Sequence, residues 1–354
     1  MMDRIHIDSV AFIHRMQQEL AEKAVDIQYK TQSNFWKKWG KVGRELSIRD
    51  VNYHFSYLIE SIRNQDFMLF VRYSEWLKEL FAGLGFPENT VKVTFECMRS
   101  ALKEKLPKNI FEIADFYLKK GVEQAQKQSN ESRTYLDPSA PLYTLAKDYL
   151  EALLSGQKQT AIRLVLDAVE QGVDIKNIYL WIFQNCQYEI GRLWHLNKIS
   201  VAQEHYCSAV TQLIMSQLYT YIFSSNKIGR SLMAACVHSE LHEIGIRMVS
   251  DFFELAGWDT YYLGANTPDS SIIQALDKTQ PDILALSATM PFHLDSLRRT
   301  ISNVRKSAPK ETKIIVGGFA LNTSKNLWEQ LGADGYAGDA QEALRMAQDL
   351  LHKR

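Results

Sequence analysis

Short apolar runs that alternate with amphipathic helical patterns after Arg230 constrain the fold of this chain most strongly. The runs are SLMAACVH, TYYLG, DILALSA, KIIVGG and GYAG, and helical patterns fill about 243–256, 269–278, 294–307 and 323–330. Parallel strands need crossover helices, and strands that are covered on both faces are apolar throughout. The pattern predicts a doubly wound α/β domain with a parallel sheet over residues 230–354.

The residues before this domain are predicted to be all-α. Apolar side chains recur at three- and four-residue spacing in residues 1–126, as at Val51, Phe55 and Leu58. We expect an N-terminal helical domain there. The segment 127–142 is rich in Ser, Asn, Asp and Pro, which is typical of a linker.

A second helical region follows the linker. Its helical patterns cover 143–154, 157–171, 174–193 and 200–224, with short breaks between them. Amphipathic helices joined by short connections favour a four-helix bundle, which we place at residues 143–225.

Composition is that of an ordinary globular protein, with 46% hydrophobic and 23% charged residues. Lys plus Arg and Asp plus Glu each number 41, so the net charge is zero and we expect no direct nucleic-acid binding. No run of about 18 apolar residues and no signal-peptide core is present, so we expect a cytoplasmic protein that does not span a membrane. The cysteines, Cys97, Cys186, Cys207 and Cys236, form no CxxC pair and are expected to be reduced.

The loop after the first strand carries residues that suit a metal site. It contains Glu240-x-His242-x-x-Gly245. Ligands of such sheets bind at the carboxyl ends of the strands. An imidazole there presents one nitrogen to a metal while a carboxylate accepts the other ring N–H. Gly245 leaves room for a bulky group at the helix start. The alternative is a solvated histidine in a loop between strand and helix.

Two further strand ends add to this pattern. Ser287 and Thr289 follow the third strand, and Gly317 and Gly318 end the fourth. Hydroxyls and a diglycine at neighbouring strand ends predict a deep slot. The His loop, the Ser loop and the diglycine, in this order, resemble the cobalamin-binding Rossmann-like domain.

This resemblance implies a cobalt-containing cofactor. His242 would be the lower cobalt ligand, and the cofactor's dimethylbenzimidazole tail would lie beside Ser287, Gly317 and Gly318. Leu241 and Thr289 would belong to the same cofactor-binding surface. Glu240 stands where that family usually has Asp.

The helical bundle carries a second motif. Trp194 is followed directly by His195, and nine residues separate Trp194 from the pair Glu204 and His205. This is similar to the helical cap of methionine synthase and of CarH-type light-sensing repressors. In the photoreceptor form, the Trp shields an adenosyl group, the Glu hydrogen-bonds it, and the His beside the Glu shapes the pocket. The resemblance makes His195 the upper cobalt ligand after light has removed that group. The alternative for each element alone is a core tryptophan and an exposed Glu–His pair.

The N-terminal domain is dense in aromatic residues, which a plain helical core would explain. The layout of the whole chain also looks like that of photocobilins, and this resemblance implies a bilin such as biliverdin. No cysteine lies in an attachment motif, so the bilin would be held non-covalently. Arg63, Arg72 and Arg99 are the candidate partners for its propionates.

These observations lead to one hypothesis and two alternatives. The hypothesis is an adenosylcobalamin-binding photoreceptor, not an enzyme, in which breakage of the cobalt–carbon bond by light changes the conformation. A bilin would be a second chromophore, and a homo-oligomer or a protein partner would receive the signal. No winged-helix pattern precedes the cap, so the chain resembles the sensing half of a CarH-type protein. The alternatives are a corrinoid methyl-carrier of a methyltransferase system and a light-independent cobalamin sensor.

Overall fold

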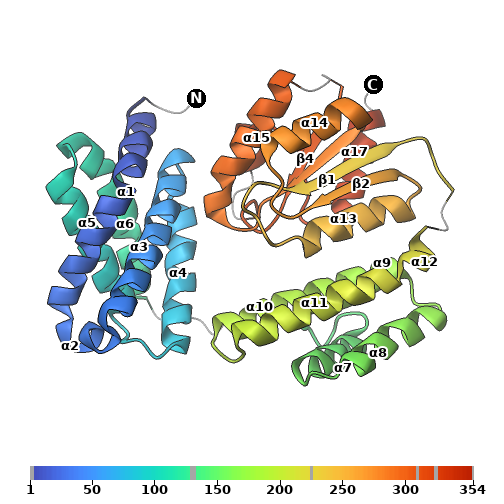
Figure 1. Ribbon diagram of the computed structural model, residues 1–354, viewed down its shortest axis with the longest axis horizontal. Helices are drawn as coiled ribbons and strands as arrows, with labels where there is room; N and C mark the ends of the chain where they lie inside the picture. The colour runs from blue at the N-terminus through green and yellow to red at the C-terminus, as the bar shows by residue number, and fades with distance from the viewer. Residues whose placement is uncertain (1–3, 128–132, 224–225, 308–310, 323–325, 353–354) are drawn as a thin grey trace. The chain divides into compact units, whose positions relative to one another are not determined.

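The chain divides into two units, Met1–Glu131 and Ser132–Arg354 (Figure 1). The computed structural model describes residues 4–127, 133–223, 226–307, 311–322 and 326–352. Within these ranges, no helix is long and apolar enough to cross a membrane.

The first unit is helical throughout its described residues, as predicted. Its helices are α1 (Arg4–Thr31), α2 (Ser33–Trp36), η1 (Lys37–Trp39), α3 (Gly40–Arg63), α4 (Phe67–Gly83), α5 (Thr90–Lys105) and α6 (Lys108–Ala125). Helix α1 packs along α3 and α5, and α6 packs against α4 and α5.

Aromatic side chains fill the centre of this unit. Phe70 and Phe95 are fully buried, and the rings of Tyr57 and Tyr73 stack with centroids 3.6 Å apart. The Tyr73 hydroxyl lies 2.5 Å from Nδ1 of buried His54, and burial lowers the pKa of that imidazole to about 3. The imidazole is therefore neutral, and its Nδ1 and the Tyr73 hydroxyl form a hydrogen bond. These contacts account for much of the aromatic density as helical core.

The residues considered for bilin binding have partners inside the unit. Arg63 forms an ion pair with buried Glu60, and Arg99 donates to Asp115 at 2.5 Å. Cys97 is buried in α5, and burial raises the pKa of its thiol to about 12. A bilin chromophore thus stays a prediction from the sequence.

The sheet domain of the second unit confirms the predicted doubly wound fold. Its strands are β1 (Ser231–Cys236), β2 (Asp259–Gly264), β3 (Ile283–Ser287), β4 (Lys313–Gly317) and β5 (Gly335–Tyr336). All pairings are parallel, in the order β2-β1-β3-β4-β5. The covering helices are α13 (Ile244–Leu255) and α17 (Ala340–His352) on one face, and α14 (Asp269–Thr279), α15 (Leu294–Ser307) and α16 (Leu327–Leu331) on the other.

Two helices differ from the prediction. The helix expected at 323–330 is α16, which ends one residue later, and residues 323–325 lie outside the described ranges. Helix α17 was not predicted, because its buried face is built largely from alanines. Small side chains at three- and four-residue spacing give a weak hydrophobic signal, although they suit close packing of a helix on a sheet.

The strand order fixes where a ligand can bind. Strand β1 pairs with β2 on one side and with β3 on the other. The connection after β1 therefore leads to one edge of the sheet, and the connection after β3 leads towards the other. The loops that leave β1 and β3 diverge, and a crevice at the carboxyl ends of these strands is the usual ligand site of such sheets.

The bundle also follows the prediction. It consists of α7 (Tyr143–Leu154), α8 (Lys158–Glu170), a continuous run of α9 (Ile175–Asn177), π-helical η2 (Ile178–Gln184) and α10 (Asn185–His195), and α11 (Val201–Gln217) with α12 (Tyr219–Ile222). The third helix extends to His195, past the predicted end at 193. Met248 and Phe252 of α13 join the core of the bundle, so the bundle packs on that helix of the sheet domain.

Candidate functional site

A tight turn between α10 and α11 positions the residues expected to face the cofactor from above. Asn197 has a left-handed φ of 55°, and the Lys198 N–H donates to the Leu193 carbonyl at 2.8 Å, which ends α10. Ser200 and Gln203 form a capping box that begins α11. The end of α10 and the start of α11 consequently lie side by side (Figure 1).

The carboxylate of Glu204, in the first turn of α11, is oriented by its neighbours. Nδ1 of His205 lies 2.5 Å from one carboxylate oxygen, and the Ser208 hydroxyl donates to the other at 3.0 Å. Glu204 is half-buried and His205 is exposed. The first turn of a helix favours a negative charge.

Trp194 and His195 differ in burial at the end of α10. Trp194 is partly buried and packs against the bundle core, whereas His195 is buried. His195 is therefore not a surface residue, and it lies next to the tryptophan that was predicted to cap the cofactor.

Glu240 is the centre of the loop after β1. Its fully buried carboxylate accepts Nδ1–H of His242 at 2.5 Å and Nδ1–H of His293 at 2.8 Å. Backbone N–H groups donate to the same carboxylate from His242 at 3.0 Å, Thr289 at 2.7 Å and Met290 at 3.1 Å. These donors come from the loops after β1 and β3, so one side chain joins both sides of the crevice.

These hydrogen bonds decide the charge of Glu240. Burial alone would raise its pKa, but the hydrogen bonds from His242 and His293 outweigh burial and hold the pKa below the usual range. The carboxylate is therefore ionised. A buried anion of this kind is stable only when donors surround it.

His242 presents its other nitrogen outward. The side chain is 60% exposed, and because Glu240 holds Nδ1, Nε2 is the nitrogen left for a metal. The hydrogen bond to Glu240 raises the pKa of His242, and the charge of Glu204 raises it further.

The strand ends meet closely at the diglycine. Ser287 pairs in register with Gly317 across β3 and β4. Gly318 has a φ of 103°, and a Cβ on it would lie 2.3 Å from the Ala288 carbonyl oxygen. Only glycine fits there. The backbones after β3 and β4 are therefore in contact here. Backbone atoms line the predicted slot at this point.

Two exposed apolar side chains follow strand ends of the sheet. Leu241 is 70% exposed and Phe319, directly after the diglycine, is 51% exposed. Open space surrounds Gly245, where an added Cβ would meet no atom within 4 Å. Exposed apolar residues that follow strand ends are expected at a ligand surface. These features fit a large, flat, partly apolar cofactor.

The possible metal ligands of this site suit a metal ion that is already bound inside such a cofactor. In the part of the chain that the structure describes, no group of three or more His, Cys, Asp or Glu residues could hold a bare ion. A metal bound in a macrocycle needs only axial ligands from the protein, and His242 offers one. The site therefore fits the expected corrin.

Two residues of this site were missed by the sequence analysis. His293 lies in η3 (Pro291–His293) and is 53 positions from Glu240, so no local motif connects them. Phe319 follows the diglycine, and only its place after a strand end could have indicated it.

Comparison with known families agrees with this geometry. Two family models, each described as a B12 binding domain, match residues 145–219 and 230–345. They cover the bundle and the sheet domain. The chain is a cobalamin-binding protein with a helical B12-binding cap and a doubly wound B12-binding domain.

Similar proteins include corrinoid carriers and a repressor. Dimethylamine corrinoid protein 3 of Methanosarcina mazei is 27% identical over 47% of this chain and 96% of its own length. Dimethylamine corrinoid protein 1 of Methanosarcina acetivorans is 28% identical over 36% of this chain and 59% of its own. The HTH-type transcriptional repressor CarH of Myxococcus xanthus is 23% identical over 55% and 65%. The chain thus spans less than two thirds of the last two relatives.

A solved structure supports the fold. The monomethylamine corrinoid protein of Methanosarcina barkeri superposes with a TM-score of 0.54 at 18% identity, over 59% of this chain and 99% of that one. This likeness shows the fold alone.

The role of His293 leads to a prediction. His293→Ala removes one donor from a buried anion and should lower the free energy of unfolding by about 1.5–3 kcal/mol. Chemical denaturation of the full chain without cofactor would measure this loss. His238→Ala, an exposed histidine of the same loop, is the matched control and should change little. If His293→Ala and His238→Ala have the same free energy of unfolding, the hydrogen bond from His293 does not stabilise the buried carboxylate of Glu240.

Proposed function

We propose that this cobalamin-binding protein is an adenosylcobalamin-dependent light sensor. The observation that carries the proposal is the carboxylate of Glu204 in the first turn of α11, ten positions after Trp194, which hydrogen bonds with His205 and Ser208 orient. A carboxylate that faces the upper side of a corrin suits a ligand with hydroxyl donors, such as an adenosyl group. A methyl group has nothing to donate.

Each predicted residue has a role in this proposal. Nε2 of His242 would hold the cobalt of a bound cobalamin, and Glu240 would fix the tautomer of His242. Leu241 and Gly245 face the corrin. Ser287, Thr289, Gly317 and Gly318 border the tail, and Trp194, Glu204 and His205 enclose the upper ligand.

The signal would arise in the cap. When bound, adenosylcobalamin supplies a cobalt–carbon bond that light can break. Trp194 and Glu204 lose their contacts once the adenosyl pocket empties. The cap then shifts between two packings on α13, which is a population shift driven by lost ligand contacts. The likeness to the CarH repressor supports this reading.

A methyl-carrier of a methyltransferase system is the second candidate. The likeness to dimethylamine corrinoid proteins favours it. Such a carrier would use the same His242 loop and would dock to a methyltransferase through the cap. It gives no role to Glu204. A light-independent cobalamin sensor would use Glu204 but would keep its conformation under light.

Glu204→Ala tests the proposal against the methyl-carrier. One hydrogen bond in a closed site contributes about 1–3 kcal/mol, so the variant should lose roughly five- to hundredfold in preference for adenosylcobalamin over methylcobalamin. Dark titrations of the full chain with both cobalamins measure this preference. Glu170→Ala, an exposed cap glutamate, should behave as the native chain. Equal affinity of the native chain for the two cobalamins would favour the methyl-carrier.

Illumination of His195→Ala tests the lit state. We expect His195 to take the upper cobalt site of the native protein, because neutral imidazole is a better ligand than water. The native chain should then show a lit spectrum with two axial histidines and slow dark recovery. The variant should show a water-ligated spectrum. Identical lit spectra and recovery rates would contradict the role of His195, and a native chain that keeps its hydrodynamic radius under light would favour the light-independent sensor.

A further inference from the structure

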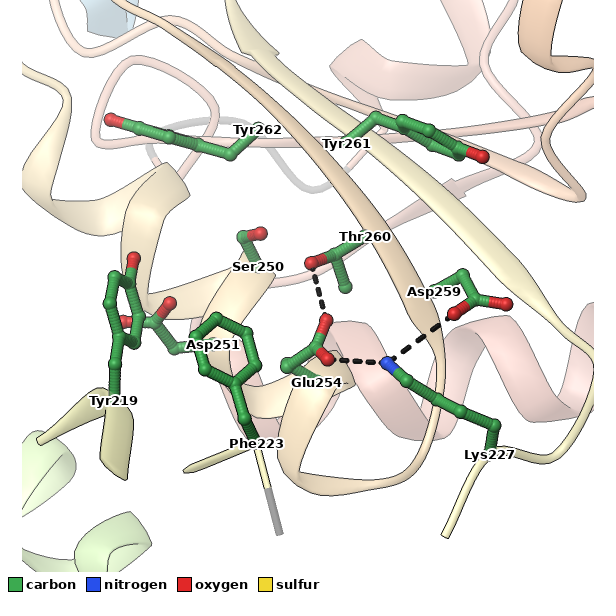
Figure 2. A pocket seen from close by; sticks show the side chains of 10 residues that line it. All are labelled: Tyr219, Phe223, Lys227, Ser250, Asp251, Glu254, Asp259, Thr260, Tyr261 and Tyr262. Atoms are coloured by element: carbon green, nitrogen blue, oxygen red, sulfur yellow. Dashed lines mark hydrogen bonds and ion pairs between the residues drawn. The ribbon is translucent and has the colours of Figure 1, made fainter. Parts of the chain in front are cut away.

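In the cavity between α12, α13 and β2, polar side chains pair with one another (Figure 2). The Lys227 ammonium forms ion pairs with Glu254 and Asp259. The Thr260 hydroxyl donates to the same Glu254 at 2.7 Å. The cap contains the opposite case, a hydroxyl whose one proton faces two acceptors.

Ser208 of α11 carries this hydroxyl. Its Oγ lies 3.0 Å from a carboxylate oxygen of Glu204 and 3.0 Å from the side-chain oxygen of Gln187 in α10. A serine hydroxyl has one proton, so it donates to one of these oxygens at a time. The other Ser and Thr side chains of α11, Thr211 and Ser216, donate to the backbone carbonyl four residues earlier. Ser208 is instead turned toward side chains.

A buried network fixes the orientation of the Gln187 amide. Thr211 donates its proton to the Cys207 carbonyl at 2.9 Å, so the Thr211 oxygen can only accept from other groups. Nε2–H of Gln187 donates to this oxygen at 2.9 Å, and the Tyr149 hydroxyl lies 2.8 Å from it. Burial raises the pKa of Tyr149, so the phenol stays protonated and donates. The side-chain oxygen of Gln187 therefore faces Ser208 as an acceptor.

The two acceptors of Ser208 are not equivalent. A negatively charged carboxylate accepts a stronger hydrogen bond than a neutral amide oxygen, so we expect Ser208 to donate to Glu204. The other carboxylate oxygen of Glu204 meets His205, whose side chain is 75% exposed. Exposed pairs of this kind contribute little free energy. The half-buried Ser208 is therefore the contact that holds the carboxylate in place.

We propose that Ser208 is the positioning residue that sets the preference of the site for adenosylcobalamin. Its hydroxyl holds the carboxylate of Glu204 toward the upper ligand, and Gln187 accepts the proton of Ser208 when the carboxylate turns away. The first state suits an upper ligand with hydroxyl donors, and the second suits a pocket without one. This inference rests on the proposed function, because that function gives Glu204 its contact with the adenosyl group.

Dark titrations of the full chain with adenosylcobalamin and with methylcobalamin, followed by absorption, test this role. Ser208→Ala should weaken adenosylcobalamin binding roughly three- to tenfold, because Glu204 loses its half-buried donor, and should leave methylcobalamin binding unchanged. Ser208→Thr keeps the hydroxyl and should keep the native preference. Ser155→Ala, at an exposed serine that follows α7, is the control and should bind both cobalamins as the native chain does.

A double-mutant cycle separates positioning from a general loss of packing. Because Ser208 acts through Glu204, Ser208→Ala should change adenosylcobalamin affinity no further in a chain that already carries Glu204→Ala. A further loss of affinity in the double variant would show that Ser208 acts independently of Glu204 and would overturn the proposal.

The titrations also separate this inference from the proposed function. Equal affinity of the native chain for the two cobalamins would overturn both. A native preference that Glu204→Ala abolishes and Ser208→Ala keeps would overturn the role of Ser208 alone. If Ser208→Ala does not fold by circular dichroism, Ser208→Cys decides, because a thiol is a weaker donor than a hydroxyl. An undiminished preference in Ser208→Cys would then overturn the role of Ser208.

Discussion

The buried carboxylate of Glu240 is the interaction on which the cobalamin site depends. An isolated buried anion is strongly disfavoured, so this side chain is stable only with its ring of donors. Those donors come from His242, His293, and the backbone after β3. The charge therefore fixes two loops on opposite sides of the topological switch point. It also leaves the second nitrogen of His242 facing outward.

The sheet domain and the cap, the two parts of the second unit, differ in how their site residues are held. In the proposed function the sheet domain would supply the lower ligand, and hydrogen bonds to buried Glu240 hold the loop that carries His242. The cap supplies polar groups on helix ends, where Asn197 and Ser200 force a tight reversal between α10 and α11. In the proposed function the cap would repack on α13 when the upper ligand is lost, while the lower side stays in place.

Much of this arrangement could be predicted from the sequence because its signals are local. Apolar runs predicted the strands, and Glu240 and His242 share a motif of three residues. His293 and Phe319 escaped prediction because only the folded sheet brings them to the site. Helix α17 escaped because alanines form its buried face. The pairing of Asp251 with Tyr179 likewise depends on the docking of the cap against α13, which no sequence pattern records.

Electron paramagnetic resonance of the cobalt(II) form tests the central claim most directly. The full chain is loaded with cobalamin, with its histidines labelled by nitrogen-15, and compared with His242→Ala and the control His238→Ala. If His242 is the lower ligand, the native chain and the control show splitting from a labelled nitrogen, and His242→Ala loses it. Splitting that persists unchanged in His242→Ala would contradict the account.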